Sequence, residues 1–492
     1  MLRLCFHKRS INNLLNGETT LTRVYVLTKS KLAFAIFLLL ISTQAYSAGV
    51  SPYLPLNLPN HIAQKIERLG AIAGETSLNK PYKIAQVTAL ARKIQTTHPL
   101  LYRDLAPYLR NHKERTSTSL MQVSLASSNN SISNPYHFGA DGESSLLLET
   151  AGYAMYSDYI GVSASAIISE NNVNKAQGMV HVGVDILQLD IGYKSRWWSV
   201  GRINSLLLSN ESEAFASVSA SNVVPISAFD INYEVFAGRL NNEVGIYSGD
   251  IFEQDKPYIT GATFNFSPIK QVTLGFAHTT VFGGGVRDGG GSDFLDALTA
   301  NNLGSAENSS FSEAQADRRY ALQARYNHEV VGFHYSIYGE HVTKKVLGDN
   351  GEQPNAATIG IYFPVINDSS LRIEATRYDQ GFYNSDIYNN GYQDNKTSLA
   401  HFIATKAQNS AAKSLTAQWF WSMNADESLT TSLGWSQVAL LAENSNELVN
   451  SGLNFSADYR SRFENVYWGI EASSGIDAVG EQVYRLGAYI GF

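Results

Sequence analysis

Alternation of apolar with polar or small residues dominates the chain from about residue 116 to its C-terminus. Between Tyr484 and Phe492 every second residue is apolar, and the residues between them are polar or small. The same period of two recurs over residues 160–168, 453–460 and 466–473. A period of two predicts β-strands with one apolar and one polar face. Such strands fit either a β-sandwich or a membrane barrel with a water-filled lumen.

The lengths of the connections between the predicted strands favour the barrel. Short links, such as residues 186–188 and 327–332, alternate with long ones, such as residues 279–319 and 379–414. Outer-membrane barrels alternate in this way, with short periplasmic turns and longer extracellular loops. Counting strands by this rule gives eighteen, with a single poorly patterned strand assigned within residues 203–222. The sequence therefore predicts an all-β transmembrane barrel of about 18 antiparallel strands over residues 116–492.

Ahead of the barrel the apolar spacing is helical. Ile62, Ile66 and Leu69 recur at three- and four-residue intervals, a similar stripe runs over residues 84–94, and Pro99 is a suitable start for a third helix. Such stripes are typical of packing faces rather than of ligand sites. We therefore predict a small helical bundle over residues 48–115. It should be periplasmic, because an even number of strands returns both ends of the barrel to that side.

The first 47 residues have the features of a secretory signal. An apolar run from Leu32 to Ile41 follows two lysines and ends in Ala45-Tyr46-Ser47-Ala48. A basic segment, a short apolar core and small residues at the cut define a signal peptide. We expect cleavage after Ser47, with Ala48 as the second choice. The apolar run is too short for a membrane-spanning helix, which needs about 20 residues, so an exported outer-membrane protein is predicted.

Composition excludes several classes of function. Only 16% of the 492 residues are charged, and the net charge of −7 argues against a nucleic-acid partner. The single cysteine, Cys5, excludes disulfide frameworks and thiolate metal sites. The sequence contains no HExxH motif, no EF-hand loop and no Ser-His-Asp spacing around His278, His341 or His401. We therefore expect no cofactor, no metal and no enzymatic activity.

The most suggestive stretch for ligand binding is the predicted extracellular loop at residues 379–397. It combines four aromatic residues with several asparagines. Aromatic faces suit the C–H surfaces of sugars, and amides suit their hydroxyl groups. The alternative is an aromatic girdle followed by an ordinary polar loop. The predicted glycan contacts in this loop, with the aromatic side chains exposed, are Phe382, Tyr383, Tyr388, Asn389, Asn390 and Tyr392.

Two further groups of residues are weaker candidates. Arg287, Arg318 and Arg319 could supply positive charge to an acidic glycan, although solvated loop charge is the commoner role for each. Trp197 and Trp198 either stack on sugars or anchor at the membrane interface, where Trp and Tyr concentrate. The interface is favoured for the tryptophans.

Several stretches, in order, resemble the Wzi family of outer-membrane capsule-assembly proteins. They are Pro52-Tyr53-Leu54-Pro55-Leu56, Arg196-Trp197-Trp198, Ser205-Leu206-Leu207-Leu208-Ser209-Asn210, Phe236-Ala237-Gly238-Arg239-Leu240, Phe282-Gly283-Gly284-Gly285, Asp293-Phe294-Leu295-Asp296-Ala297-Leu298 and the Tyr-rich segment from Tyr383 to His401. The resemblance implies an eighteen-stranded barrel with periplasmic helices that acts as a surface lectin for capsular polysaccharide. Phe282, Ala400 and Val200 depart from the family pattern, which leaves the identity of the glycan open.

Two functions follow as hypotheses. The first is a non-enzymatic, lectin-like outer-membrane protein that attaches capsular or exopolysaccharide to the cell surface. Its partners would be that polymer, the outer-membrane lipids and the polysaccharide export machinery. The alternative is a diffusion channel for small solutes, because a barrel of this size is wide enough for one. Plugs at the two ends of the barrel would argue against the channel.

Overall fold

The structure is a computed structural model. It describes residues 49–75, 77–111, 115–129, 144–169, 173–248, 251–285, 291–299, 316–345, 353–366, 368–394, 397–400, 403, 410–441, 447–464, 466–478 and 480–492. The predicted signal peptide, with its cleavage site at Ser47 and Ala48, and the candidate Arg287 lie outside the described residues.

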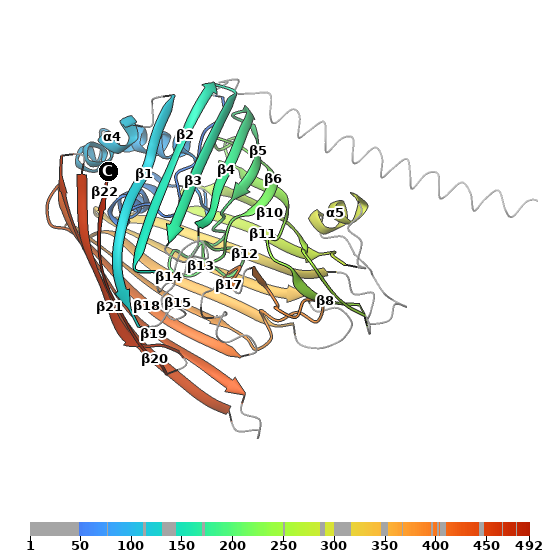
Figure 1. Ribbon diagram of the computed structural model, residues 1–492. Helices are drawn as coiled ribbons and strands as arrows, with labels where there is room; N and C mark the ends of the chain where they lie inside the picture. Colours follow the sequence, from blue (N-terminus) through green and yellow to red (C-terminus); the bar gives the residue numbers. More distant parts are fainter. Residues whose placement is uncertain are drawn as a thin grey trace, which may run out of the picture.

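An 18-stranded antiparallel sheet closes on itself, because the first strand pairs with the last (Figure 1). The closure runs in register through Val123 and Ile490. The strands of this barrel are β1 (Thr116–Ser128), β2 (Leu146–Ser157), β3 (Ile160–Ser169), β4 (Val173–Val184), β5 (Leu187–Lys194), β6 (Phe215–Ser221), β7 (Asn232–Arg239), β10 (Tyr258–Ile269), β11 (Val272–Phe282), β12 (Ala316–Val330), β13 (Phe333–Lys345), β14 (Asn355–Ile366), β15 (Ser369–Tyr378), β18 (Ala411–Ser422), β19 (Glu427–Leu441), β20 (Glu447–Phe463), β21 (Val466–Ile476) and β22 (Gln482–Gly491). Closure leaves no unpaired sheet edge, as a membrane-spanning sheet requires. The predicted fold class is confirmed.

The two faces of the strands carry opposite chemistry. Outward positions expose large apolar side chains, such as Val162, Leu189 and Leu486, to the surroundings. Inward positions bury polar and charged side chains, such as Asp190 and Glu374. An apolar outer band around a polar interior is the arrangement that lipid imposes on a barrel. No helix in the described ranges is long and apolar enough to cross a membrane.

Connections differ in length between the two ends of the barrel. One end, here called the short-turn end, joins strands through links such as 158–159, 270–271 and 331–332. The opposite, long-connection end carries most of the long segments, including 195–214, 240–257, 283–315 and 379–410. The sequence pattern predicts one strand within residues 203–222. The structure places β6 there but leaves the preceding residues as a folded connection.

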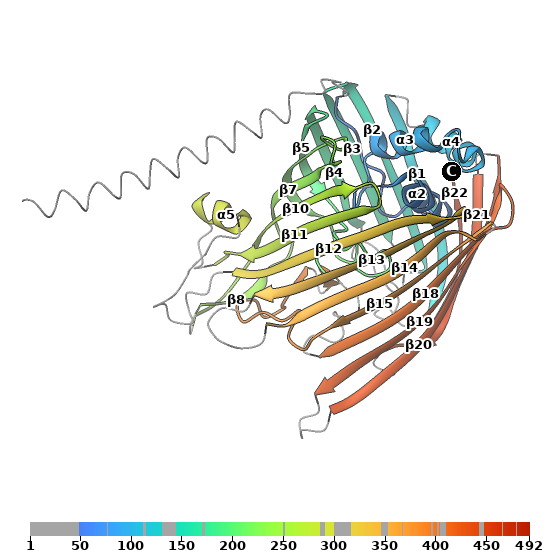
Figure 2. The same cartoon turned by 180° about the vertical axis from the view of Figure 1, so that it is seen from behind.

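Three helices, α2 (Asn60–Ala73), α3 (Ile84–Ile94) and α4 (Pro99–Asn111), pack together ahead of the barrel. α2 ends at Gly74, whose positive φ of 72° lets its N–H bond back to the Gly70 carbonyl. The helices lie at the short-turn end, where the backbone N–H of Val50 donates to Asp158 O in the β2–β3 turn at 2.7 Å (Figure 2). The described residues ahead of the barrel, 49–75 and 77–111, are here called the N-terminal segment. This segment therefore closes the short-turn end of the lumen.

Smaller elements complete the long-connection end. The hairpin of β8 (Val244–Ser248) and β9 (Ile251–Asp255) and the short pair β16 (Gln393–Asp394) and β17 (Thr397–Ser398) lie outside the barrel sheet. Helix α5 (Gly291–Leu298) packs against β10 and β11, where its Phe294 contacts Phe282. Phe282 shares its strand face with the outward residue Phe276, so α5 covers the outer wall of the barrel.

Candidate functional site

Glu67 of α2 holds the N-terminal segment inside the lumen. Its carboxylate accepts hydrogen bonds from Lys80 at 2.6 Å and from Arg202 Nε at 2.9 Å, and Arg372 of β15 lies 3.6 Å away. All four side chains are largely withdrawn from solvent. One buried anion therefore joins a helix, the 195–214 connection and the barrel wall.

The surroundings shift the pKa values of Glu67, on α2, and of Glu75, just beyond the end of that helix, in opposite directions. Burial would raise the pKa of Glu67, but Arg202, Lys80 and Arg372 outweigh it and hold that pKa well below its usual range. Burial also disfavours the charged form of Lys80, and its pKa falls to about 8. The cations paired with Glu75 lie farther away, Arg202 at 3.8 Å and Arg325 at 3.6 Å. Burial therefore dominates there and raises the pKa of Glu75 to about 7.

The protonation of Glu75 should make the stability of the plugged barrel depend on pH. A folded pKa near 7 against an ordinary 4.5 means that the folded state holds a proton that the unfolded state releases. The stabilisation is therefore complete below pH 4.5 and lost as pH rises through about 7, a loss of about 3 kcal/mol. Glu75→Gln should remove this dependence, so urea unfolding of the two proteins should diverge between pH 4.5 and 8. Parallel pH profiles would contradict the assignment.

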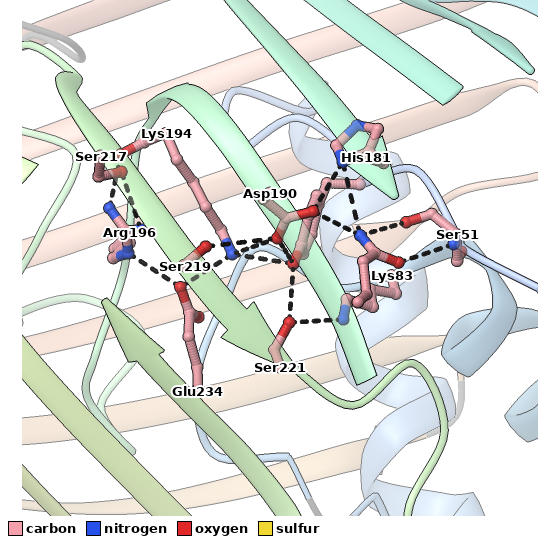
Figure 3. Close-up of polar contacts among 12 residues, drawn as sticks. Ser51, Lys83, His181, Asp190, Lys194, Arg196, Ser217, Ser219, Ser221 and Glu234 are labelled. Atoms are coloured by element: carbon pink, nitrogen blue, oxygen red, sulfur yellow. Dashed lines mark hydrogen bonds and ion pairs between the residues drawn. The ribbon is translucent and has the colours of Figure 1, made fainter. Parts of the chain in front are cut away.

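A second polar network lines the lumen across β4 to β7 (Figure 3). Asp190 of β5 accepts hydrogen bonds from Tyr53 at 2.7 Å and from Gln188 at 2.7 Å, and it contacts His181 at 2.8 Å. Lys194 lies 3.4 Å from Asp190 and donates to Tyr53 and Glu234. The network therefore ties Tyr53 of the N-terminal segment to the barrel wall.

Lys83 and Ser51 make further links from the N-terminal segment to the same wall. The ammonium of Lys83 donates to Ser221 at 2.7 Å and to the carbonyl of Asn222 at 2.8 Å. The backbone N–H of Ser51 donates to Gln188 at 2.8 Å. Burial lowers the pKa of Lys83 to about 7. The short-turn end of the lumen is thus closed by specific polar contacts as well as by apolar packing.

The loop predicted to expose its aromatic residues folds inward instead. Phe382, Tyr383, Tyr388 and Tyr392 are each 5% exposed or less and belong to one core cluster with Trp198 and Leu206. The hydroxyl of Tyr388 donates to the carbonyl of Gly283 at 3.1 Å. The prediction of exposed aromatic side chains is therefore wrong, because the four rings pack against a connection that is distant in the sequence instead of facing water.

The same loop docks on the β8–β9 hairpin through its backbone. Tyr247 N–H donates to Ile387 O at 2.9 Å, and Asn389 N–H donates to Gly245 O at 3.0 Å. Asp394 accepts from the backbone and side-chain amides of Asn241 and Asn242. Residues 379–394 therefore form part of a layer that closes the long-connection end.

Arg319 anchors this layer to the wall of the barrel. Its guanidinium pairs with Asp317 at 3.0 Å, donates to Phe382 O at 3.0 Å and lies 3.8 Å from the ring centroid of Tyr392. Arg318 is buried on the outward face of β12, which it shares with exposed Leu322. The expectation that Arg318 and Arg319 offer charge to a solvated glycan is wrong, since both are buried among protein groups.

The two tryptophans also lie inside the barrel rather than at the interface. Trp198 is fully buried against Phe236, with ring centroids 5.2 Å apart. Trp197 donates its indole N–H to Gly201 O at 2.8 Å, and its backbone pairs with Lys80. The favoured interfacial role is therefore wrong for both residues.

The docked loop leaves a row of polar residues at its surface. Asp379, Gln380, Asp386 and Asn389 are exposed, and Asn390 is partly exposed. We call these five residues the polar rim. Their carboxylates and amides supply hydrogen-bond acceptors and donors, so the rim is the part of the predicted loop whose polar groups face the surroundings.

Sequence reasoning did not single out Glu67, His181 or Asp190. For Asp190 and His181 the sequence offers a weak indication, which the structure makes recognisable. Asp190 is an acid within an otherwise alternating strand and His181 lies on the polar face of the preceding one, but register had to bring them together. Among the described residues no group of three or more acidic, His or Cys side chains could hold a metal ion.

Together, the closed barrel, its apolar exterior and a lumen filled from both ends define an outer-membrane barrel that is plugged by its own chain. The family of capsule assembly protein Wzi matches residues 111–479, and the chain belongs to that family. The solved structure of Wzi from Escherichia coli aligns with a TM-score of 0.66 at 15% identity, covering 90% of this chain and 99% of that one. That protein is described as a carbohydrate-binding β-barrel involved in group 1 capsule assembly.

Two Pseudomonas aeruginosa structures also align. OccK8 (OprE) and OpdQ each cover 77% of this chain at 8% identity and a TM-score of 0.48, and 97% and 96% of their own chains are covered. No curated protein sequence matches the chain.

Proposed function

We propose that this protein is a lectin-like outer-membrane barrel that holds capsular or extracellular polysaccharide at the cell surface. Membership of the Wzi family supports a part in capsule assembly. The carbohydrate binding described for the Escherichia coli relative supports a glycan as ligand. In this role the protein binds polymer and performs no chemistry on it.

The observation that carries the proposal is the filled lumen. The N-terminal segment occupies the short-turn end through Glu67 and Tyr53, and the 379–394 loop occupies the other end through Arg319. A barrel closed at both ends suits surface attachment better than diffusion. Steady currents in planar bilayers with the wild-type protein would support the channel instead.

The proposed orientation follows from the lengths of the connections. In outer-membrane barrels the short turns face the periplasm and the longer loops face the exterior. The helices α2–α4 would then close the periplasmic end of the barrel, where polysaccharide export machinery could contact them. Outer-membrane lipids would surround the apolar band, and the polar rim would face the polymer.

The polar rim should contribute directly to polymer binding. Asp386→Ala combined with Asn390→Ala removes two sets of hydrogen-bonding groups without touching the buried aromatic core. Each hydrogen bond contributes about 1 kcal/mol, so affinity for the native polymer should fall about tenfold or more. Binding of purified protein to immobilised polymer measures the effect, and Asp368→Ala, an exposed acid at a short turn, is the matched control. Unchanged affinity in the double variant would remove the rim from the site.

Loss of the whole protein tests the role in the cell. A deletion strain should release polymer into the medium while the total amount of polymer stays constant. A fall in total polymer would place the protein in synthesis or export rather than in attachment.

A further inference from the structure

The lumen contains a Ser-His-Asp arrangement on three neighbouring strands. Ser163 Oγ of β3 lies 2.9 Å from His181 Nε2 of β4, and His181 Nδ1 lies 2.8 Å from Asp190 Oδ1 of β5. His181 faces Asp190 directly in the β4–β5 register. On its other side His181 pairs with Gly161 of β3, which has no side chain. The imidazole ring can therefore extend diagonally to Ser163, two residues further along the same strand.

The hydrogen-bond partners fix the roles of the three groups. Tyr53 and Gln188 both donate to Asp190, and Lys194 lies 3.4 Å away, so the environment favours the ionised carboxylate. A carboxylate only accepts hydrogen bonds, so Nδ1 of His181 carries the ring proton. In the neutral ring Nε2 then accepts from the Ser163 hydroxyl, as a general base does toward its nucleophile.

Ser163 borders a cavity between the barrel wall and the N-terminal segment. The cavity has a volume of about 70 Å³ and is lined by Leu54, Pro55, Ser163, Gln177 and Lys194 among others. Ser163 is only partly buried, whereas His181 has no exposed surface. A cavity of about 150 Å³ holds benzene, so this one admits only a short acyl group.

The donors available for an oxyanion restrict the chemistry to reactive esters. β3 is paired on both sides, so the backbone N–H groups near Ser163 belong to the barrel ladder. The carboxamide oxygen of Gln177 accepts from Ser165 and Ser195 at 3.4 Å each, which leaves its NH₂ group as a side-chain donor. One such donor stabilises an oxyanion less than a backbone pair does, so esters rather than amides fit this site.

We propose that Ser163, His181 and Asp190 form a hydrolytic site for short-chain carboxylic esters. Ser163 Oγ attacks the ester carbonyl carbon while His181 takes the hydroxyl proton. The bond to the alcohol oxygen breaks, and His181 returns the proton to that oxygen. Water then attacks the acyl-Ser163 with His181 as base, which releases the carboxylic acid and restores the serine. The site lies beside the N-terminal segment, apart from the polar rim, so it does not depend on polymer binding.

Covalent labelling of the full-length protein, purified in detergent micelles, tests the site. Methanesulfonyl fluoride, whose methanesulfonyl group is as small as a short acyl group, should sulfonylate Ser163, as identified by peptide mass spectrometry, and p-nitrophenyl acetate should be hydrolysed. Ser163→Ala should abolish the label and lower the hydrolysis rate by at least about 100-fold, and His181→Gln should do the same. Ser119→Ala, a hydroxyl deletion in the same cavity, should behave as wild type.

Two results would overturn the proposal. One is a folded, heat-modifiable wild-type protein that takes no label at Ser163. The other is a Ser163→Ala variant that hydrolyses the ester at the wild-type rate. Ser163→Ala should bind polymer normally, so failure of the ester site and failure of the glycan proposal give different results.

Discussion

Glu67→Ala should release the N-terminal segment from the barrel. The substitution leaves Lys80, Arg202 and Arg372 without the carboxylate that they share in the interior. Removing one partner from a buried ion pair costs about 3–5 kcal/mol, because the remaining charge stays desolvated. Trypsin should then cleave after Lys65, which is 7% exposed in the intact protein, and urea should unfold the variant at lower concentration.

Two comparisons separate this effect from a general loss of charge. Glu67→Gln keeps the shape of the side chain and some of its hydrogen bonds, so its cost should be smaller. Asp104→Ala removes a partly exposed partner that lies 3.9 Å from Lys65, and such pairs contribute at most about 1 kcal/mol. Equal trypsin sensitivity of the Glu67 and Asp104 variants would show that Glu67 is not the anchor.

The barrel could be predicted from sequence because its signals are local. Alternation in a segment such as residues 484–492 follows from one lipid-facing and one lumen-facing side. The uneven connection lengths supplied the strand number, and only the region around β6 was poorly patterned. Its preceding connection, residues 195–214, folds into the lumen, and no periodic pattern marks a segment that packs irregularly.

The interior of the loops could not be predicted in the same way. A loop rich in Tyr and Asn has the same sequence pattern whether its rings face water or pack against Trp198, which lies almost 200 positions earlier in the chain. The Ser163–His181–Asp190 contacts depend on strand register, and sequence spacing does not encode it. Ion pairs such as Glu67 with Arg372 join a helix to a distant strand. Each of these features is decided by tertiary packing rather than by local pattern.

Arg319→Ala should open the loop layer at the long-connection end. Arg319 is fully buried, and its loss leaves Asp317 unpaired, removes the donor to Phe382 O and takes a cation from the face of Tyr392. Leaving a buried charge unpaired destabilises the closed loop by about 3–5 kcal/mol. A destabilisation of 3 kcal/mol alone raises the population of molecules with an open loop by roughly 100-fold. The four aromatic residues of the loop are chymotrypsin sites that packing protects in the closed state.

Chymotrypsin should therefore cleave Arg319→Ala after Phe382, Tyr383, Tyr388 or Tyr392 at least about 100-fold faster than wild type. The barrel itself should still run as a folded, heat-modifiable species, because β12 keeps its backbone pairs on both sides. Arg377→Ala, an exposed arginine on nearby β15, should leave cleavage unchanged. Arg319→Lys retains the charge but loses the planar group that contacts Phe382 and Tyr392 together, so it should fall between the two. Cleavage of Arg319→Ala at the wild-type rate would mean that the aromatic core alone holds the loop, with Arg319 contributing little.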